Sequence, residues 1–274
     1  MEISAGRDGW TTIAGRRHHH LRWGDPSNPA LLLLHGGYSS ARGTWRHTAP
    51  DFADRWSVHA PDHRGHGESA WSPDSDYSLR SYVDDLREFM AQTGLDSQGP
   101  LPVIGHSLGG YIAVSFATRH PGLFGPVVLV DSLPRDFTPD QRESLRNRPV
   151  PQESFATYTE AESAVGSRRP GTGHPRYGLV QQADGRWRRR TDVVGLHRAL
   201  PLPDPDRERL WEDLRGLPTP TRLIRGEHGS VPGEDADRMS ALGVEVTTYD
   251  GAGHWVHRDA PRRFVEDVMS FLPG

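Results

Sequence analysis

The chain has 274 residues, of which 25% are charged and 34% belong to the hydrophobic set, and its formal net charge at pH 7 is −4. This size fits one large α/β domain or one core with an inserted subdomain, and the regular apolar segments argue against disorder. The modest charge does not indicate a nucleic-acid partner, since nucleic-acid binders usually carry a strong basic excess. The absence of Cys excludes disulfides, thiolate nucleophiles and Cys-ligated metals, and the absence of Lys excludes Schiff-base and Ser-Lys chemistry.

The first ten residues, MEISAGRDGW, contain no apolar run, so we expect no secretory signal. No stretch approaches the roughly 20 apolar residues that a membrane-spanning helix needs. We therefore expect a cytoplasmic enzyme that has neither a membrane nor a nucleic acid as partner. The sequence leaves the oligomeric state open.

Apolar runs alternate with amphipathic stretches along the first half of the chain. Continuous apolar runs separated by helices are typical of parallel strands that are buried on both faces. We expect an N-terminal antiparallel pair, followed by a mostly parallel sheet with helices on both faces. The predicted strands are 12–13, 18–23, 31–34, 58–61, 102–105 and 127–130, and the predicted helices are 78–93 and 108–119.

The pattern changes after Asp131. Residues 133–217 are rich in Pro, Arg and polar residues, with weaker helices and a predicted hairpin around 183–186. An insertion of this length is too long for a plain connection in a compact domain. We interpret 133–217 as a cap over the carboxyl edge of a core made of 1–132 and 218–274. In the second part of the core the predicted elements are strand 221–225, helix 233–242, strand 244–249 and helix 261–271.

The strongest motif is GHSLGG at residues 105–110, between a predicted strand and a predicted helix. This context fits a G-x-S-x-G nucleophile elbow, because the sharp turn leaves no room for side chains at Gly105 and Gly109. The turn lifts the hydroxyl of Ser107 out of the sheet and places it at the positive end of a helix. The backbone N–H of Leu108 then points at the reacting oxygen.

Two further motifs supply other groups that a serine nucleophile needs. LLLLHGGY at 31–38 ends a strand in small residues, and the N–H of Gly37 is the candidate for the second oxyanion donor. DGAGHWVHRDAP at 250–261 follows a predicted strand and presents His254 as the general base for Ser107. His257 is close by, but its position just before a predicted helix favours a capping or packing role.

Together, the order of Ser107 and His254, the elbow, HGG and GHWVH resemble the α/β-hydrolase family over nearly the whole chain. APDHRGHGES at 60–69 is similar to that family's loop after its fourth strand, and GRWRRRTD is similar to a segment of capped, esterase-like members. The resemblance implies an eight-stranded, mostly parallel sheet, a cap, and a Ser-His-acid triad in the order nucleophile, acid, histidine. It implies no cofactor and no metal, and a small-molecule substrate bound between core and cap.

The acid of such a triad is not evident in this sequence. In most relatives it follows the strand that corresponds to 221–225, in a pattern like G-x-x-D. Here that position falls on Gly229 or, with a shift of one residue, on Ser230. Neither residue is a carboxylic acid.

Three acids lie within plausible reach of His254, and of these we expect Asp131 to be the third member of the triad, with Glu227 as the alternative. Asp131 ends the strand VVLVD, where some relatives place their acid, although an Asp there also caps the turn in relatives that keep the usual one. Glu227 lies in the usual loop but two or three residues early. Asp235 fits better as a residue of a helix N-terminus. The sequence also leaves open that the site has no acid.

These residues leave three functions to weigh. Ser107 with His254 suits acyl transfer on an ester, thioester, lactone or activated C–C bond. Loss of the acid from a serine triad costs roughly 10⁴ in kcat, which an efficient hydrolase would rarely tolerate. If the site has no acid, the alternative is therefore a slow lyase or cyclase of a specialised pathway. A binding protein that uses the pocket as a receptor is opposed by the intact Ser107, His254 and oxyanion glycines.

Two charged or titratable clusters are expected to be structural. HHH at 18–20 has no apparent third metal ligand, so we predict surface residues of an edge strand. The charges of 133–217 nearly balance, which predicts a solvated surface for its arginine cluster, Arg186, Arg188, Arg189 and Arg190.

Overall fold

The computed structural model describes residues 6–134, 138–166, 175–200 and 202–273. Its central element is an eight-stranded sheet in the order β1-β2-β4-β3-β5-β6-β10-β11. The pairs β1–β2 and β2–β4 are antiparallel and all the others are parallel, so the expected mostly parallel α/β sheet is confirmed. The strands are β1 Arg7–Ile13, β2 Arg16–Trp23, β3 Ala30–Leu34, β4 Ser57–Pro61, β5 Leu101–His106, β6 Phe124–Val130, β10 Thr221–Gly226 and β11 Glu245–Tyr249.

Helices bury both faces of this sheet, as the continuous apolar strands require. Alternate residues of β3 illustrate the arrangement: Leu32 and Leu34 belong to one apolar cluster, and Leu31 and Leu33 belong to the other. The first cluster is covered by α3 Leu79–Thr93, α4 Leu108–Arg119, α10 Leu210–Arg215 and α11 Gly233–Ala241. The second is covered by α1 Ala41–Trp45, α2 Ala49–Phe52, α12 Val256–Asp259 and α13 Pro261–Phe271.

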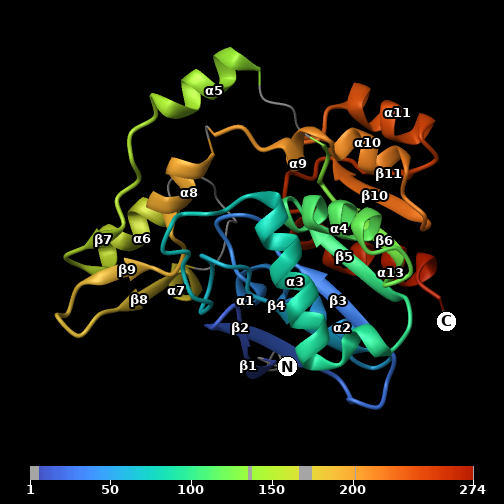
Figure 1. The fold of residues 1–274 in the computed structure, drawn as a ribbon, viewed down its shortest axis with the longest axis horizontal. Helices are drawn as coiled ribbons and strands as arrows, with labels where there is room; N and C mark the ends of the chain where they lie inside the picture. Colours follow the sequence, from blue (N-terminus) through green and yellow to red (C-terminus); the bar gives the residue numbers. More distant parts are fainter. Residues whose placement is uncertain (1–5, 135–137, 167–174, 201, 274) are drawn as a thin grey trace.

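The chain between β6 and β10 contains short elements with a small sheet of their own. In this sheet β9 lies between β7 and β8 and is antiparallel to both. The predicted hairpin is confirmed, since Gln181 of β8 pairs with Trp187 of β9. Figure 1 shows the small sheet with α6, α7 and α8 at the left of the view and α5 apart from them at the top, whereas α10 lies beside the main sheet. The elements are α5 Pro139–Arg146, β7 Ser154–Phe155, α6 Tyr158–Gly166, α7 Pro175–Gly178, β8 Leu179–Gln181, β9 Trp187–Arg189, α8 Val193–Ala199 and α9 Pro205–Glu208, before α10.

The prediction that His18, His19 and His20 are surface residues of an edge strand is wrong. The edge strand is β1, and the three histidines of β2 are 3%, 2% and 5% exposed. Gly9 of β1 pairs with His20, and a Cβ at Gly9 would lie 2.3 Å from the His20 ring, so this glycine makes room for the buried imidazole. His19 is buried with two partners, because Asp62 and Asp8 each lie within hydrogen-bond distance of its ring.

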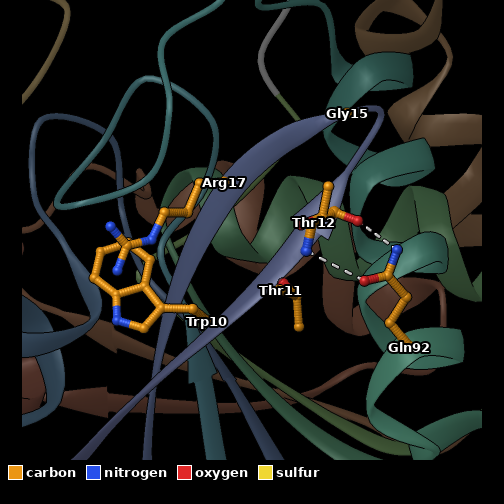
Figure 2. Close-up of a pocket in the computed structure, with 6 residues that line it drawn as sticks. All are labelled: Trp10, Thr11, Thr12, Gly15, Arg17 and Gln92. Atoms are coloured by element: carbon orange, nitrogen blue, oxygen red, sulfur yellow. Dashed lines mark hydrogen bonds between the residues drawn. The ribbon is translucent and has the colours of Figure 1, made fainter.

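A hollow of about 520 Å³ lies on the β1–β2 hairpin (Figure 2). Gln92 of α3 closes one side of it by accepting a hydrogen bond from the backbone N–H of Thr12, at 3.3 Å. The strands β2, β4 and β3 lie between β1 and β5, which leads to Ser107. No His, Asp or Glu lines the hollow, so it offers no acid–base pair; its lining residues are Trp10, Thr11, Thr12, Gly15, Arg17 and Gln92.

Candidate active site

Ser107 stands at the sharp turn between β5 and α4, where the elbow motif predicts it. Its φ of 50° lies in the left-handed region, which non-glycine residues rarely adopt. The flanking glycines make this turn possible: a Cβ at Gly105 would lie 2.5 Å from the carbonyl oxygen of Gly109. A Cβ at Gly109 would lie 2.2 Å from the carbonyl oxygen of Leu34. Backbone packing therefore requires both glycines of G-x-S-x-G.

The loop after β3 lies against this elbow. A Cβ at Gly36 would lie 3.3 Å from the Cβ of Ser107, and one at Gly37 would lie 3.9 Å from the Cβ of Leu108. The two residues predicted to donate to an oxyanion, Gly37 and Leu108, are thus neighbours beside Ser107.

His254 follows β11 in the predicted loop and is bonded to Asp131, which follows β6. The distance from His254 Nδ1 to Asp131 Oδ2 is 2.6 Å. The Asp131 side chain is fully buried and that of His254 is 20% exposed. A carboxylate only accepts hydrogen bonds, so Nδ1 carries the proton in this contact and Nε2 is the basic nitrogen.

The other candidates have different environments. The carboxylate of Glu227 is 52% exposed and accepts a hydrogen bond from the backbone N–H of Gly251 at 2.8 Å. Asp235 lies in the first turn of α11, as predicted. His257 is fully buried and packs against the rings of Trp45, His106 and Phe264. Burial, and then the charge of Arg258, hold the pKa of His257 well below its ordinary value.

Asp131 fills the space next to the position where most relatives are expected to carry the acid. A Cβ at Gly229 would lie 2.1 Å from Asp131 Oδ1, so no side chain fits there while this carboxylate is in place. The backbone N–H of Ser230 donates to Asp131 Oδ2 at 2.6 Å, and the N–H of Gly226 donates to Oδ1 at 3.3 Å. Backbone donors of the β10–α11 loop therefore compensate for the burial of this carboxylate.

Ser230 also contributes to this site, although it was not among the residues predicted from the sequence. Its hydroxyl donates to Asp131 Oδ2 at 2.8 Å, and its oxygen is 2.5 Å from His254 Nδ1. The side chain therefore touches both members of the His–Asp contact. The available signal was a glycine at the usual acid position followed at once by a hydroxyl residue.

His106 is a second group at the site that was not predicted from the sequence. Its Nε2 lies 3.0 Å from the carbonyl oxygen of His254, and the centroids of the two rings are 4.7 Å apart. Burial, followed by the nearby histidines, holds the pKa of His106 well below its ordinary value. A neutral His106 with Nε2 protonated donates to that carbonyl and fixes the backbone of the His254 loop. Its position between Gly105 and Ser107 in the elbow was the available signal.

Neither a metal cluster nor a membrane helix was found in the described part of the chain. Within those ranges, no group of three or more His, Asp or Glu side chains is arranged to hold a metal ion. No helix there is both long enough and apolar enough to cross a bilayer.

Comparison with known proteins identifies the family. The model of the alpha/beta hydrolase family matches residues 31–267. Esterase Rv0045c of Mycobacterium tuberculosis is 30% identical over 272 residues, which cover 92% of this chain and 85% of that protein. The sn-1-specific diacylglycerol lipase ABHD11 of Mus musculus is 28% identical over 270 residues, which cover 93% of this chain and 84% of that protein.

A solved structure agrees at the level of the fold. The crystal structure of E-2-(acetamidomethylene)succinate hydrolase superposes with a TM-score of 0.81 and 23% identity, over 97% of this chain and 98% of that one. The esterase and the lipase among the relatives support an α/β-hydrolase enzyme. By the family match over most of its length, this chain belongs to the alpha/beta hydrolase family.

Proposed function

We propose that the protein is a serine hydrolase that cleaves an ester, thioester, lactone or activated C–C bond. In this proposal Ser107 is the nucleophile, His254 is the general base and Asp131 is the acid. The observation that carries it is the 2.6 Å contact between His254 Nδ1 and Asp131 Oδ2. This contact supports Asp131, rather than Glu227, as the third member of the proposed triad.

The proposed reaction uses these groups in two stages. His254 Nε2 takes the proton of Ser107 as Oγ attacks the carbonyl carbon, and the N–H groups of Gly37 and Leu108 stabilise the oxyanion. The intermediate collapses, and the leaving group departs with the proton from His254. Water then attacks the acyl-enzyme with His254 again as base, which releases the acid and restores Ser107.

Asp131 suits the role that the proposal gives it. It fixes the tautomer of His254 and stabilises the imidazolium that forms when Nε2 takes a proton. The lyase or cyclase alternative was based on a site without an acid. The contact of Asp131 with His254 supports a site that has one. We therefore propose ordinary hydrolysis.

We further propose that 133–217 forms a cap and that the small-molecule substrate binds between it and the core. Buried hydrogen bonds that link α8 to the core support this. Asp192, the N-cap of α8, donates its N–H to the carbonyl oxygen of Gly65 at 2.8 Å. The hydroxyl of Tyr77 donates to Asp192 Oδ2 at 2.6 Å.

The test uses short p-nitrophenyl esters and an organophosphonate probe, applied to the wild type and to Ser107→Ala. We expect turnover and covalent labelling in the wild type and neither in the variant. Ser240→Ala, which removes an exposed hydroxyl on α11, is the matched control and should behave as the wild type. Labelling without turnover of any ester or thioester would favour the lyase or cyclase. Absence of labelling would contradict an activated Ser107.

A further inference from the structure

Two arginines beside the candidate site share one backbone acceptor. Arg46 follows α1, and its Nη1 donates to the carbonyl oxygen of Gly43 at 3.0 Å. Arg258 of α12 donates from Nη2 to the same oxygen. Since each guanidinium lies within hydrogen-bond distance of one atom, the two donor nitrogens are within roughly 6 Å of each other.

This pair forms no ion pair with a carboxylate in the described chain. Neither guanidinium forms an ion pair with any Asp or Glu there, whereas the guanidinium groups of Arg64 and Arg222 pair with Asp85 and Glu245. Arg258 Nε is buried and has no hydrogen-bond acceptor. Burial and the charge of Arg46 lower the pKa of Arg258 to about 9. The charge of Asp259 offsets part of this effect, but that carboxylate forms no ion pair with Arg258 in the described chain. Two adjacent, partly buried cations with no ion-paired carboxylate favour the binding of an anion.

Ring contacts connect Arg258 to the residue before Ser107. The guanidinium carbon of Arg258 lies 3.9 Å from the centroid of the Trp255 ring, and that ring lies 4.5 Å from the ring of His106, next to Ser107. On the other side, the guanidinium of Arg46 faces Tyr177 of α7 at 5.2 Å. The two arginines therefore lie where the loops after β3 and β11 meet the segment between β6 and β10.

We propose that Arg46 and Arg258 bind an anionic group, a carboxylate or a phosphate, carried by the substrate that Ser107 attacks. The inference rests on the proposed function and adds the chemical class of its substrate. A guanidinium donates two parallel hydrogen bonds to such a group, and the Trp255 ring holds Arg258 in a fixed plane for this contact. The anion supplies a directly bonded counter-charge and an acceptor for Arg258 Nε.

The test compares two esters of similar length, 4-nitrophenyl hydrogen glutarate, which is anionic, and 4-nitrophenyl valerate, which is neutral. At constant ionic strength the wild type should prefer the anionic ester. Arg46→Gln and Arg258→Gln should each lower kcat/KM for the anionic ester by about tenfold or more, through KM, and change the neutral ester less than about threefold. Arg80→Gln, which removes a side chain that is 71% exposed on α3, is the matched control and should affect neither ester.

Equal wild-type kcat/KM values for the two esters, or equal losses on both in the arginine variants, would overturn the inference. Inorganic phosphate provides an arm that does not depend on turnover. The wild type should bind phosphate in calorimetry, Arg46→Gln and Arg258→Gln should lose this binding, and phosphate should compete with the anionic ester. If no ester is cleaved, the proposed function fails, and phosphate binding alone decides whether the arginines form an anion site. If phosphate binds but does not compete with the anionic ester, the arginines do not bind the substrate, and the inference is overturned.

Discussion

The carboxylate of Asp131 occupies the space that a side chain at Gly229 would need, since a Cβ there would lie 2.1 Å from Asp131 Oδ1. The two residues follow β6 and β10, which are neighbouring parallel strands. An acid from β6 thus reaches the place that an acid following β10 would take. Gly229 leaves the space that the Asp131 carboxylate needs, because carboxylates at both positions would collide.

Asp131→Asn should lower kcat for p-nitrophenyl butyrate by roughly 10³–10⁴ with little change in KM, because the amide favours the wrong tautomer of His254. Glu227→Gln should stay within about threefold of the wild type, since that carboxylate contacts the Gly251 N–H instead. Steady-state kinetics of both variants, with circular dichroism to check folding, decide the matter. If Asp131→Asn retains kcat within a few-fold, the proposed acid is wrong.

Gly229→Ala should lower both activity and stability. The added methyl group meets a buried carboxylate, and overpacking of this kind costs about 1–3 kcal/mol of the free energy of unfolding. Gly233→Ala at the start of α11 is the matched control, because a Cβ there has no atom within 4 Å. Urea unfolding and kcat measure both effects. Two variants that are equally stable and equally active would contradict the collision.

Ser230→Ala should lower kcat by about tenfold while KM changes little, because Asp131 loses one of the donors that hold it against His254. Ser230→Thr keeps the hydroxyl and should recover most of this loss. A purely structural role predicts instead that kcat follows stability in both variants. Kinetics and thermal unfolding of the pair separate these cases.

The buried His19 should make stability depend on pH. Burial alone lowers its pKa, but the hydrogen bond with Asp62 and the charge of Asp62 outweigh this, so the pKa is raised. A raised pKa in the folded state stabilises the fold below the unfolded value of about 6.5, and this contribution is lost as the pH rises through the folded value. The wild type should therefore exceed His19→Asn in free energy of unfolding by more at about pH 6 than at about pH 9.

His228→Asn is the control for this experiment, because that side chain is 69% exposed. Its difference from the wild type should stay small and flat over the same range. A difference for His19→Asn that is equal at both pH values would show that the buried imidazole does not exchange its proton there.

The features that sequence predicted well depend on neighbours along the chain. Helix 108–119 was expected and is found at Leu108–Arg119, and 261–271 is found at Pro261–Phe271. The tight turn at Ser107 is signalled by its own flanking glycines. In such cases a few consecutive residues both indicate the local structure and explain it sterically.

The features that sequence left open depend on residues that are distant along the chain. Asp131 was the expected acid, but Glu227 stayed an alternative, because the choice depends on the order β6-β10-β11, which brings the ends of β6 and β11 to either side of β10. For the same reason Ser230 was seen only as a position that lacks a carboxylate. His18–His20 were misplaced because β1 and the loop of Asp62 bury polar rings that the local pattern marks as exposed.

Ser107 and Asp131 follow His106 and Val130, which are partners in the register of β5 and β6. The N–H of Ser107 donates to the carbonyl oxygen of Val130 at 3.1 Å, and both Ser107 and Asp131 have a positive φ, of 50° and 43°. The separation of the proposed nucleophile from the proposed acid is therefore set by strand spacing. Because His106 holds the backbone of the His254 loop, movement of the imidazole between Ser107 and the leaving group must come from rotation of the His254 side chain, while Nδ1 keeps its contacts with Asp131 and Ser230.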